Sequence, residues 1–159
     1  MGVEAILVCF PDYTGTPEQL ESSLSQLISV TRNPNSAMTS QTMCWVLDDG
    51  NHKLEVEQKL NYSGFSLRFA LCNPSSIDCV FIRIIKTIIR THELGLRFCE
   101  DCDEVPEWLS SIEMIDQYEA AIQNCIDMRR ALWQTEFGKE ELAATCAEAC
   151  RHFILPRGL

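Results

Sequence analysis

Residues 43–72 read MCWVLDDGNHKLEVEQKLNYSGFSLRFALC, and this stretch decides the fold. Apolar residues alternate with polar or charged ones over much of it, which is typical of strands with one buried and one solvated face. The turn Asp48-Asp49-Gly50-Asn51 contains Asp-Gly, which supplies the positive φ that a tight hairpin needs. A second turn, Asn61-Tyr62-Ser63-Gly64, precedes the last alternating run. The stretch therefore predicts three consecutive antiparallel strands.

A strand and a helix are expected on the N-terminal side of this stretch. The apolar run from Val3 to Phe10 is rich in β-branched residues and reads as a buried strand. Thr16 has Pro17 after it and Gln19 three residues on, which is the pattern of a helix N-cap with a capping box. We expect this helix to end near Arg32.

The order is reversed on the C-terminal side, where a helix precedes a strand. The turn Asn73-Pro74-Ser75-Ser76 opens a helix whose buried stripe is made mainly of isoleucines. Gly95 is expected to end this helix. The short run Leu96-Arg97-Phe98-Cys99 then reads as a fifth strand.

The predicted fold class is α+β, with a mainly antiparallel sheet of about five strands in the order βα-βββ-αβ. Ferredoxin-like folds have the same order of strands and helices with one strand fewer. This similarity concerns topology alone and implies no function. Two C-terminal helices, separated near Gly138, are expected to pack on the sheet. At this length we expect residues 1–155 to form a single domain, followed by a loose C-terminal tail at 156–159.

The charge of the chain argues against two classes of partner. The 159 residues carry a formal net charge of −10. Nucleic acids and anionic membrane surfaces are bound largely through Lys and Arg, so neither is an expected partner. No apolar run is long enough to form a membrane-spanning helix. The sequence fixes neither the oligomeric state nor the identity of a partner.

Nine cysteines indicate a reducing compartment rather than a disulfide framework. The number is odd, and the N-terminus has neither a basic region nor a long apolar run of the kind found in secretory signals. Most of the cysteines lie within apolar patterns, as small buried side chains do. We therefore expect free thiols and a cytoplasmic location.

The strongest compositional bias is an acidic segment after the fifth strand. Nine acidic residues and no basic residue lie between Glu100 and Asp127. A field of one sign attracts a partner of the opposite sign, although a solvated face of an acidic protein would look the same. The candidate binding residues are Asp101, Asp103, Glu104, Glu107, Glu113, Asp116 and Glu119.

The sharpest local motif is the CxxC formed by Cys99 and Cys102. Such a pair is half of a zinc site, and the other two ligands could come from Cys146 and Cys150, which are four residues apart on one helix face. A redox role is weakened by the neighbouring carboxylates, because negative charge raises a thiol pKa.

Complete catalytic motifs are missing from the sequence. Cys72, at the start of the second helix, has no base near it in sequence, and His52 and His92 lie at positions typical of surface residues. The sequence therefore favours a small soluble non-catalytic protein-binding module without a cofactor. Its acidic surface would face a basic protein partner, as in an immunity or inhibitor protein. The alternative is a zinc- or thiol-dependent protein that uses Cys99, Cys102, Cys146 and Cys150.

Overall fold

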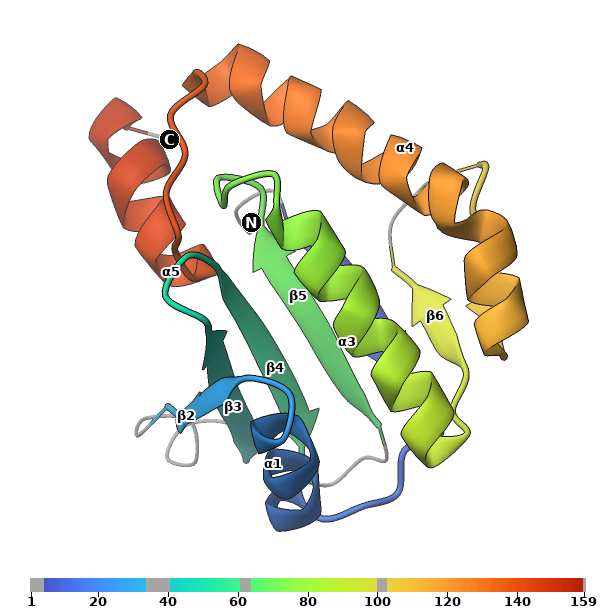
Figure 1. Cartoon of the computed structure of the whole chain (residues 1–159). Coiled ribbons are helices and arrows are strands. Elements are labelled where there is room, and N and C mark those ends of the chain that lie inside the picture. Colours follow the sequence, from blue (N-terminus) through green and yellow to red (C-terminus); the bar gives the residue numbers. More distant parts are fainter. Residues whose placement is uncertain (1–4, 34–40, 61–63, 100–102, 159) are drawn as a thin grey trace.

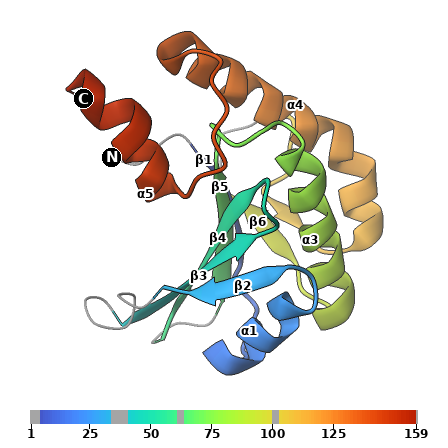
Figure 2. The same ribbon diagram turned by 60° about the vertical axis from the view of Figure 1, so that its left-hand side comes forward.

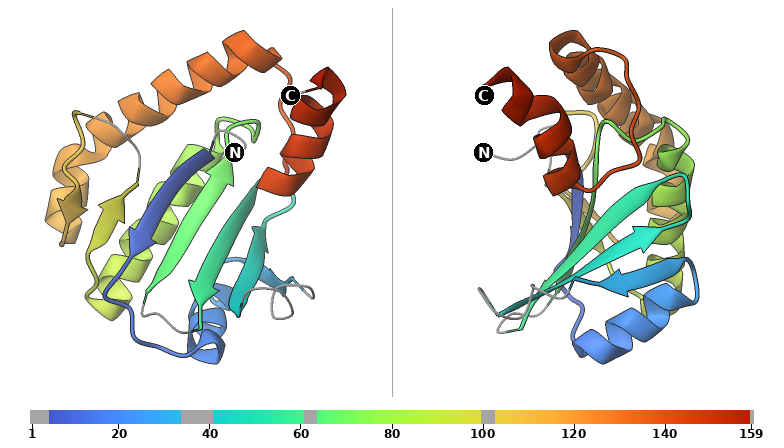
Figure 3. Two further views of the ribbon diagram at one scale, coloured as in Figure 1. Left: turned by 180° about the vertical axis from the view of Figure 1, so that it is seen from behind. Right: turned by 90° about the vertical axis from the view of Figure 1, so that its left-hand side faces the viewer.

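Seven strands form one antiparallel sheet in the order β2-β3-β4-β5-β1-β6-β7 (Figures 1 and 3). They belong to a computed structural model, which describes residues 5–33, 41–60, 64–99 and 103–158. The predicted α+β class and the antiparallel sheet are confirmed, with two strands more than expected. The strands are β1 (Ala5–Phe10), β2 (Ser29–Arg32), β3 (Thr42–Asp48), β4 (Lys53–Lys59), β5 (Phe65–Ala70), β6 (Leu96–Phe98) and β7 (Trp108–Leu109).

The predicted hairpin between β3 and β4 is present in full. Trp45 pairs with Val56 and Leu47 with Leu54, so the apolar residues of both strands share one face. Gly50 in the turn has φ of 91°, a conformation that glycine adopts without steric cost. The alternating pattern therefore gives the register as well as the existence of these strands.

The first helix is shorter than the sequence suggested. Helix α1 (Pro17–Ser25) begins with the expected capping box of Thr16 and Gln19. It ends seven residues before Arg32, and Ser29–Arg32 is strand β2, paired with β3. The expectation of a helix up to Arg32 is wrong, because β-branched Val30 and Thr31 favour a strand where an edge of the sheet is free to pair.

Helix α3 (Ile77–His92) lies against the sheet and buries its isoleucine stripe there (Figure 2). It ends where Glu93 takes the left-handed conformation with φ of 51°, two residues before the expected stop at Gly95. Gly95 has another role, since a side chain there would overlap the indole ring of Trp108. The close approach of Trp108 allows the two-residue strand β7 to pair with β6.

The two C-terminal helices lie on different sides of the sheet. Helix α4 (Ile112–Phe137) packs on α3, whereas α5 (Cys146–Ala149) lies on the opposite face, over one end of β4 and β5 (Figures 2 and 3). Helix α5 continues into the π-helical turn η1 (Cys150–Ile154) and the 3-10 helix η2 (Leu155–Arg157). Among the described residues, none of the helices has both the length and the apolar character needed to cross a bilayer.

Candidate functional site

The described members of the predicted acidic segment are all exposed and lie on consecutive parts of the chain. We call six residues the acidic surface: Asp103, Glu104, Glu107, Glu113, Asp116 and Glu119. They run from the turn after β6, past β7, into the first half of α4, at one end of the sheet (Figure 1). The seventh predicted member, Asp101, lies outside the described residues.

Two cations from neighbouring elements lie within the acidic surface. Lys86 of α3 contacts Asp116 at 2.7 Å and Glu119 at 2.9 Å, and these two hydrogen bonds raise the pKa of Lys86. Arg97 of β6 contacts Glu107 more weakly, at 3.7 Å. Six carboxylates and two cations leave a net charge of −4. Sequence reasoning could not find this pairing, because Lys86 is remote from α4 along the chain.

Cys99 contacts Cys9 rather than another predicted zinc ligand. The Cys9 and Cys99 sulfur atoms are 2.7 Å apart; Cys9 lies within β1, and Cys99 directly follows β6. Burial raises the pKa of the Cys9 thiol to about 12, and the hydrogen bond with Cys99 adds to this. Cys102, the second cysteine of the CxxC motif, lies outside the described residues.

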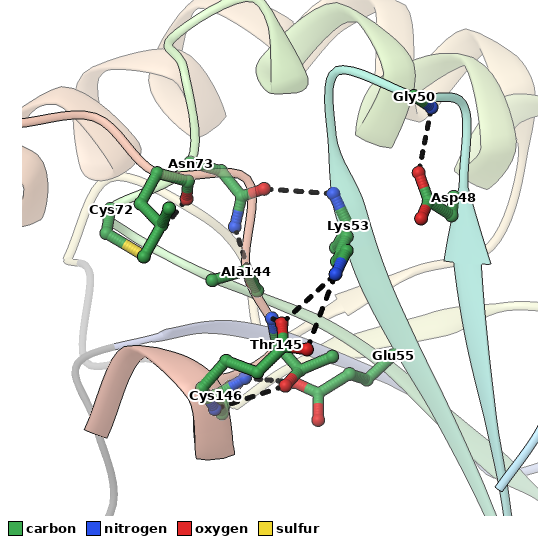
Figure 4. Close-up of polar contacts among 11 residues, drawn as sticks. Asp48, Gly50, Lys53, Glu55, Cys72, Asn73, Ala144, Thr145 and Cys146 are labelled. Atoms are coloured by element: carbon green, nitrogen blue, oxygen red, sulfur yellow. Dashed lines mark hydrogen bonds and ion pairs between the residues drawn. The ribbon is translucent and has the colours of Figure 1, made fainter. Parts of the chain in front are cut away.

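Cys146 lies elsewhere, against the strands that α5 covers. Its backbone N–H donates to the Glu55 carboxylate at 2.9 Å (Figure 4). Glu55 also accepts from Arg68 at 3.3 Å. Burial, followed by the nearby Glu55 charge, raises the pKa of the Cys146 thiol well above its ordinary value. Among the described residues, no cluster of three or more His, Cys, Asp or Glu side chains is arranged to hold a metal ion.

The buried Asn73 holds the segment between α4 and α5 in place (Figure 4). Only 1% of Asn73 is exposed. Its amide donates to the carbonyls of Ala70 and Ala144 at 2.9 and 3.0 Å, and its oxygen accepts from the Lys53 backbone N–H at 2.9 Å. The Lys53 ammonium then contacts Glu148 of α5 at 3.3 Å. Polar contacts from β4, through Lys53 and Glu55, thus join α5 to the opposite face of the sheet.

Cys72 has the environment of a structural thiol. Its sulfur donates to the Leu142 carbonyl at 3.3 Å, and burial raises its pKa to about 12. A thiol nucleophile needs the opposite shift, towards the thiolate.

Three polar residues that sequence reasoning did not group form a continuous hydrogen-bonded line. His52 Nε2 lies 2.6 Å from the Ser76 hydroxyl oxygen, and His52 Nδ1 lies 2.8 Å from an Asp49 carboxylate oxygen. Asp49 and His52 belong to the β3–β4 turn, whereas Ser76 directly precedes α3. His52 is 7% exposed and Ser76 is exposed. The three-residue spacing of Asp49 and His52 was the available signal, but Ser76 is brought to them only by the fold.

Comparisons of the chain with protein-family models, with curated proteins and with solved structures found no match.

Proposed function

We propose that this protein is a protein-binding module whose acidic surface docks onto a basic partner. The observation that carries the proposal is the exposure of all six carboxylates along one continuous part of the chain. Charges of one sign raise the rate at which an oppositely charged partner associates, and they fix its orientation. An immunity or inhibitor protein that blocks a basic toxin in the cytoplasm would use such a surface.

Lys86 and Arg97 divide the acidic surface into paired and unpaired members. Asp116 and Glu119 are bound to Lys86, so their replacement would also remove contacts that join α4 to α3. Among the described residues, Asp103, Glu104 and Glu113 have no ion pair. These three carboxylates are the ones to alter when partner binding is to be separated from stability.

Reversing the three unpaired charges is expected to weaken binding of a basic partner at least tenfold, about 1.4 kcal/mol. The test variant carries Asp103→Lys, Glu104→Lys and Glu113→Lys. The partner is first identified by affinity capture and mass spectrometry and is then purified. The measurement is its dissociation constant from this protein at low and at high salt. Wild-type binding should weaken as salt rises, because exposed charges are screened.

The matched control variant carries Glu18→Lys, Glu136→Lys and Glu141→Lys. It changes the net charge by the same amount at three exposed positions, and Glu18 matches Glu113 because both lie in the first turn of a helix. Equal loss of affinity in the two variants, or binding that ignores salt, would contradict docking through the acidic surface.

The 2.7 Å contact between the Cys9 and Cys99 sulfur atoms favours the thiol-dependent function as a second candidate. Oxidised glutathione is expected to convert this pair into a disulfide. The exposed Cys99 thiolate attacks the glutathione disulfide and releases one glutathione thiol. Cys9 then displaces the second glutathione, a slow step because burial keeps Cys9 protonated. One protein disulfide forms, and one glutathione disulfide becomes two thiols.

Peptide mapping without reduction checks this outcome. A linked Cys9–Cys99 peptide should appear after oxidation, be absent in Cys9→Ser and persist in Cys79→Ser, which removes another exposed thiol. A Cys99–Cys102 linkage as the main product would refute the pairing. Metal analysis of the purified reduced protein tests the zinc form of the hypothesis, for which stoichiometric zinc that is lost in Cys102→Ser is the required result.

A further inference from the structure

The hydrogen-bonded line of Asp49, His52 and Ser76 has the distances of a nucleophile, a general base and a group that orients the base. Catalytic hydrogen bonds of this kind span about 2.6–3.2 Å between heavy atoms. Here the Ser76–His52 distance is 2.6 Å and the shortest His52–Asp49 distance is 2.8 Å. Such constellations are recognised by geometry and roles, whatever the fold or the order along the chain.

The environment of Asp49 sets the direction of the hydrogen bonds. Burial would raise the pKa of Asp49, but hydrogen bonds from the His52 ring and from the backbone N–H groups of Asn51 and His52 outweigh it and lower the pKa. An ionised carboxylate only accepts hydrogen bonds, so Nδ1 of His52 donates to it. In the neutral ring Nε2 then carries the lone pair, and it faces the Ser76 hydroxyl.

The Ser76 hydroxyl is available to His52 because it does not cap α3, which Ser76 directly precedes. Thr16 and Ser111, which cap α1 and α4, have the extended backbone of a capping residue. Ser76 has a helical backbone instead, with φ of −61° and ψ of −14°, and its side chain makes no capping bond.

The surroundings of Ser76 suit attack on a carbonyl group. Ser76 is exposed, whereas the base behind it is shielded, so a substrate can reach the hydroxyl while His52 stays in place. The positive end of the α3 dipole favours negative charge that develops beside it. The nearest acidic side chain of the helix, Asp78, is bound to the Arg130 guanidinium, which offsets its charge.

We propose that Ser76, His52 and Asp49 form a hydrolytic site for carboxylic esters of small acyl groups. Ser76 is exposed and has the exposed, polar Ser75 beside it, so the loop offers little apolar surface to a long acyl chain. This inference is independent of the acidic surface and would add a catalytic activity to the proposed binding function.

The reaction proceeds in two balanced steps. His52 Nε2 takes the hydroxyl proton as Ser76 Oγ bonds to the carbonyl carbon, and the same proton passes to the alcohol oxygen as the ester C–O bond breaks. The products of this step are acyl-Ser76 and the free alcohol. Water then attacks the acyl group with His52 as base, which releases the carboxylic acid and restores the serine. Asp49 is a positioning residue that holds the ring of His52.

Covalent labelling separates this site from reaction at the cysteines. A fluorophosphonate probe with a small alkyl group reacts with activated serine hydroxyls, so incubation of the full chain should add one phosphonyl group, mapped to Ser76 by peptide mass spectrometry. Ser76→Ala should lose the adduct, and Ser75→Ala, which removes the exposed neighbouring hydroxyl, should keep it. Labelling at another residue, or an absence of labelling, would overturn the proposal.

Hydrolysis of p-nitrophenyl acetate gives the second readout. The turnover rate should fall about 100-fold or more in Ser76→Ala, since general-base catalysis contributes about 10²–10⁴-fold. Ser75→Ala should retain the wild-type rate. Ser75→Ala should keep the wild-type melting temperature, whereas Ser76→Ala leaves the buried Nε2 of His52 without its partner and should melt somewhat lower. Circular dichroism at the assay temperature shows that each variant is folded when its rate is measured. Equal turnover by wild type and Ser76→Ala would refute catalysis by this serine.

Discussion

Replacing Arg130 by alanine is expected to lower the free energy of unfolding by about 3–5 kcal/mol, as when one partner of a buried ion pair is lost. The Arg130 guanidinium donates two hydrogen bonds to Asp78, at 2.5 and 2.9 Å, and the two residues are only 8% and 5% exposed. Gln123 donates to the same carboxylate at 2.6 Å. Without Arg130, the Asp78 charge would stay buried between α3 and α4 with one neutral donor.

Urea denaturation followed by circular dichroism measures this effect, with Arg83→Ala as the matched control. Arg83 is exposed on α3, so its loss should change the free energy of unfolding by no more than about 0.5 kcal/mol. The double variant Asp78→Ala/Arg130→Ala should lose less than the sum of the two single variants, because neither charge is left unpaired. A loss in Arg130→Ala as small as in Arg83→Ala would contradict a buried pair.

The second large effect is expected at Asn73, where alanine should lower the free energy of unfolding by about 3 kcal/mol. The substitution leaves a buried donor and buried acceptors without their partner, and each such group costs about 1–3 kcal/mol. The lost bonds include the one to Ala144, so the segment 138–145 should also become sensitive to limited proteolysis. Both the unfolding curve and the cleavage sites are measurable.

Two variants make the Asn73 test specific. Asn51→Ala removes an exposed asparagine of the β3–β4 turn and should have little effect. Asn73→Asp keeps the acceptor for the Lys53 N–H but loses both amide donors, so it should also expose the segment to protease. Protease resistance in Asn73→Ala equal to that of wild type would show that other contacts hold α5.

Local signals explain why much of the sheet could be predicted. The Asp-Gly turn, the alternation in β3, β4 and β5, and the Thr16–Gln19 capping box each depend on residues close together in sequence. The type and position of these elements can therefore be read from a short stretch of sequence. Strands β2 and β7 were missed because each is short and exists only through a neighbouring strand.

The candidate sites depend on long-range contacts, which a pattern along the chain does not contain. Lys86, on helix α3, neutralises part of the acidic surface on α4. Cys99, which follows β6, contacts Cys9 on the neighbouring strand β1. Ser76 meets His52 because the β3–β4 turn and the start of α3 lie at the same end of the molecule. The two residues are 24 positions apart in sequence, so no short motif contains both.

The position of β1 has a consequence for how this protein is made. The first strand lies between β5 and β6, and its Ala5 pairs with Ala70 while Val8 pairs with Phe98. A ribosome releases β1 long before either partner strand is synthesised. The apolar side chains of Ile6, Val8 and Phe10, which are buried in the folded protein, thus stay uncovered on a nascent chain until β5 and β6 have been made.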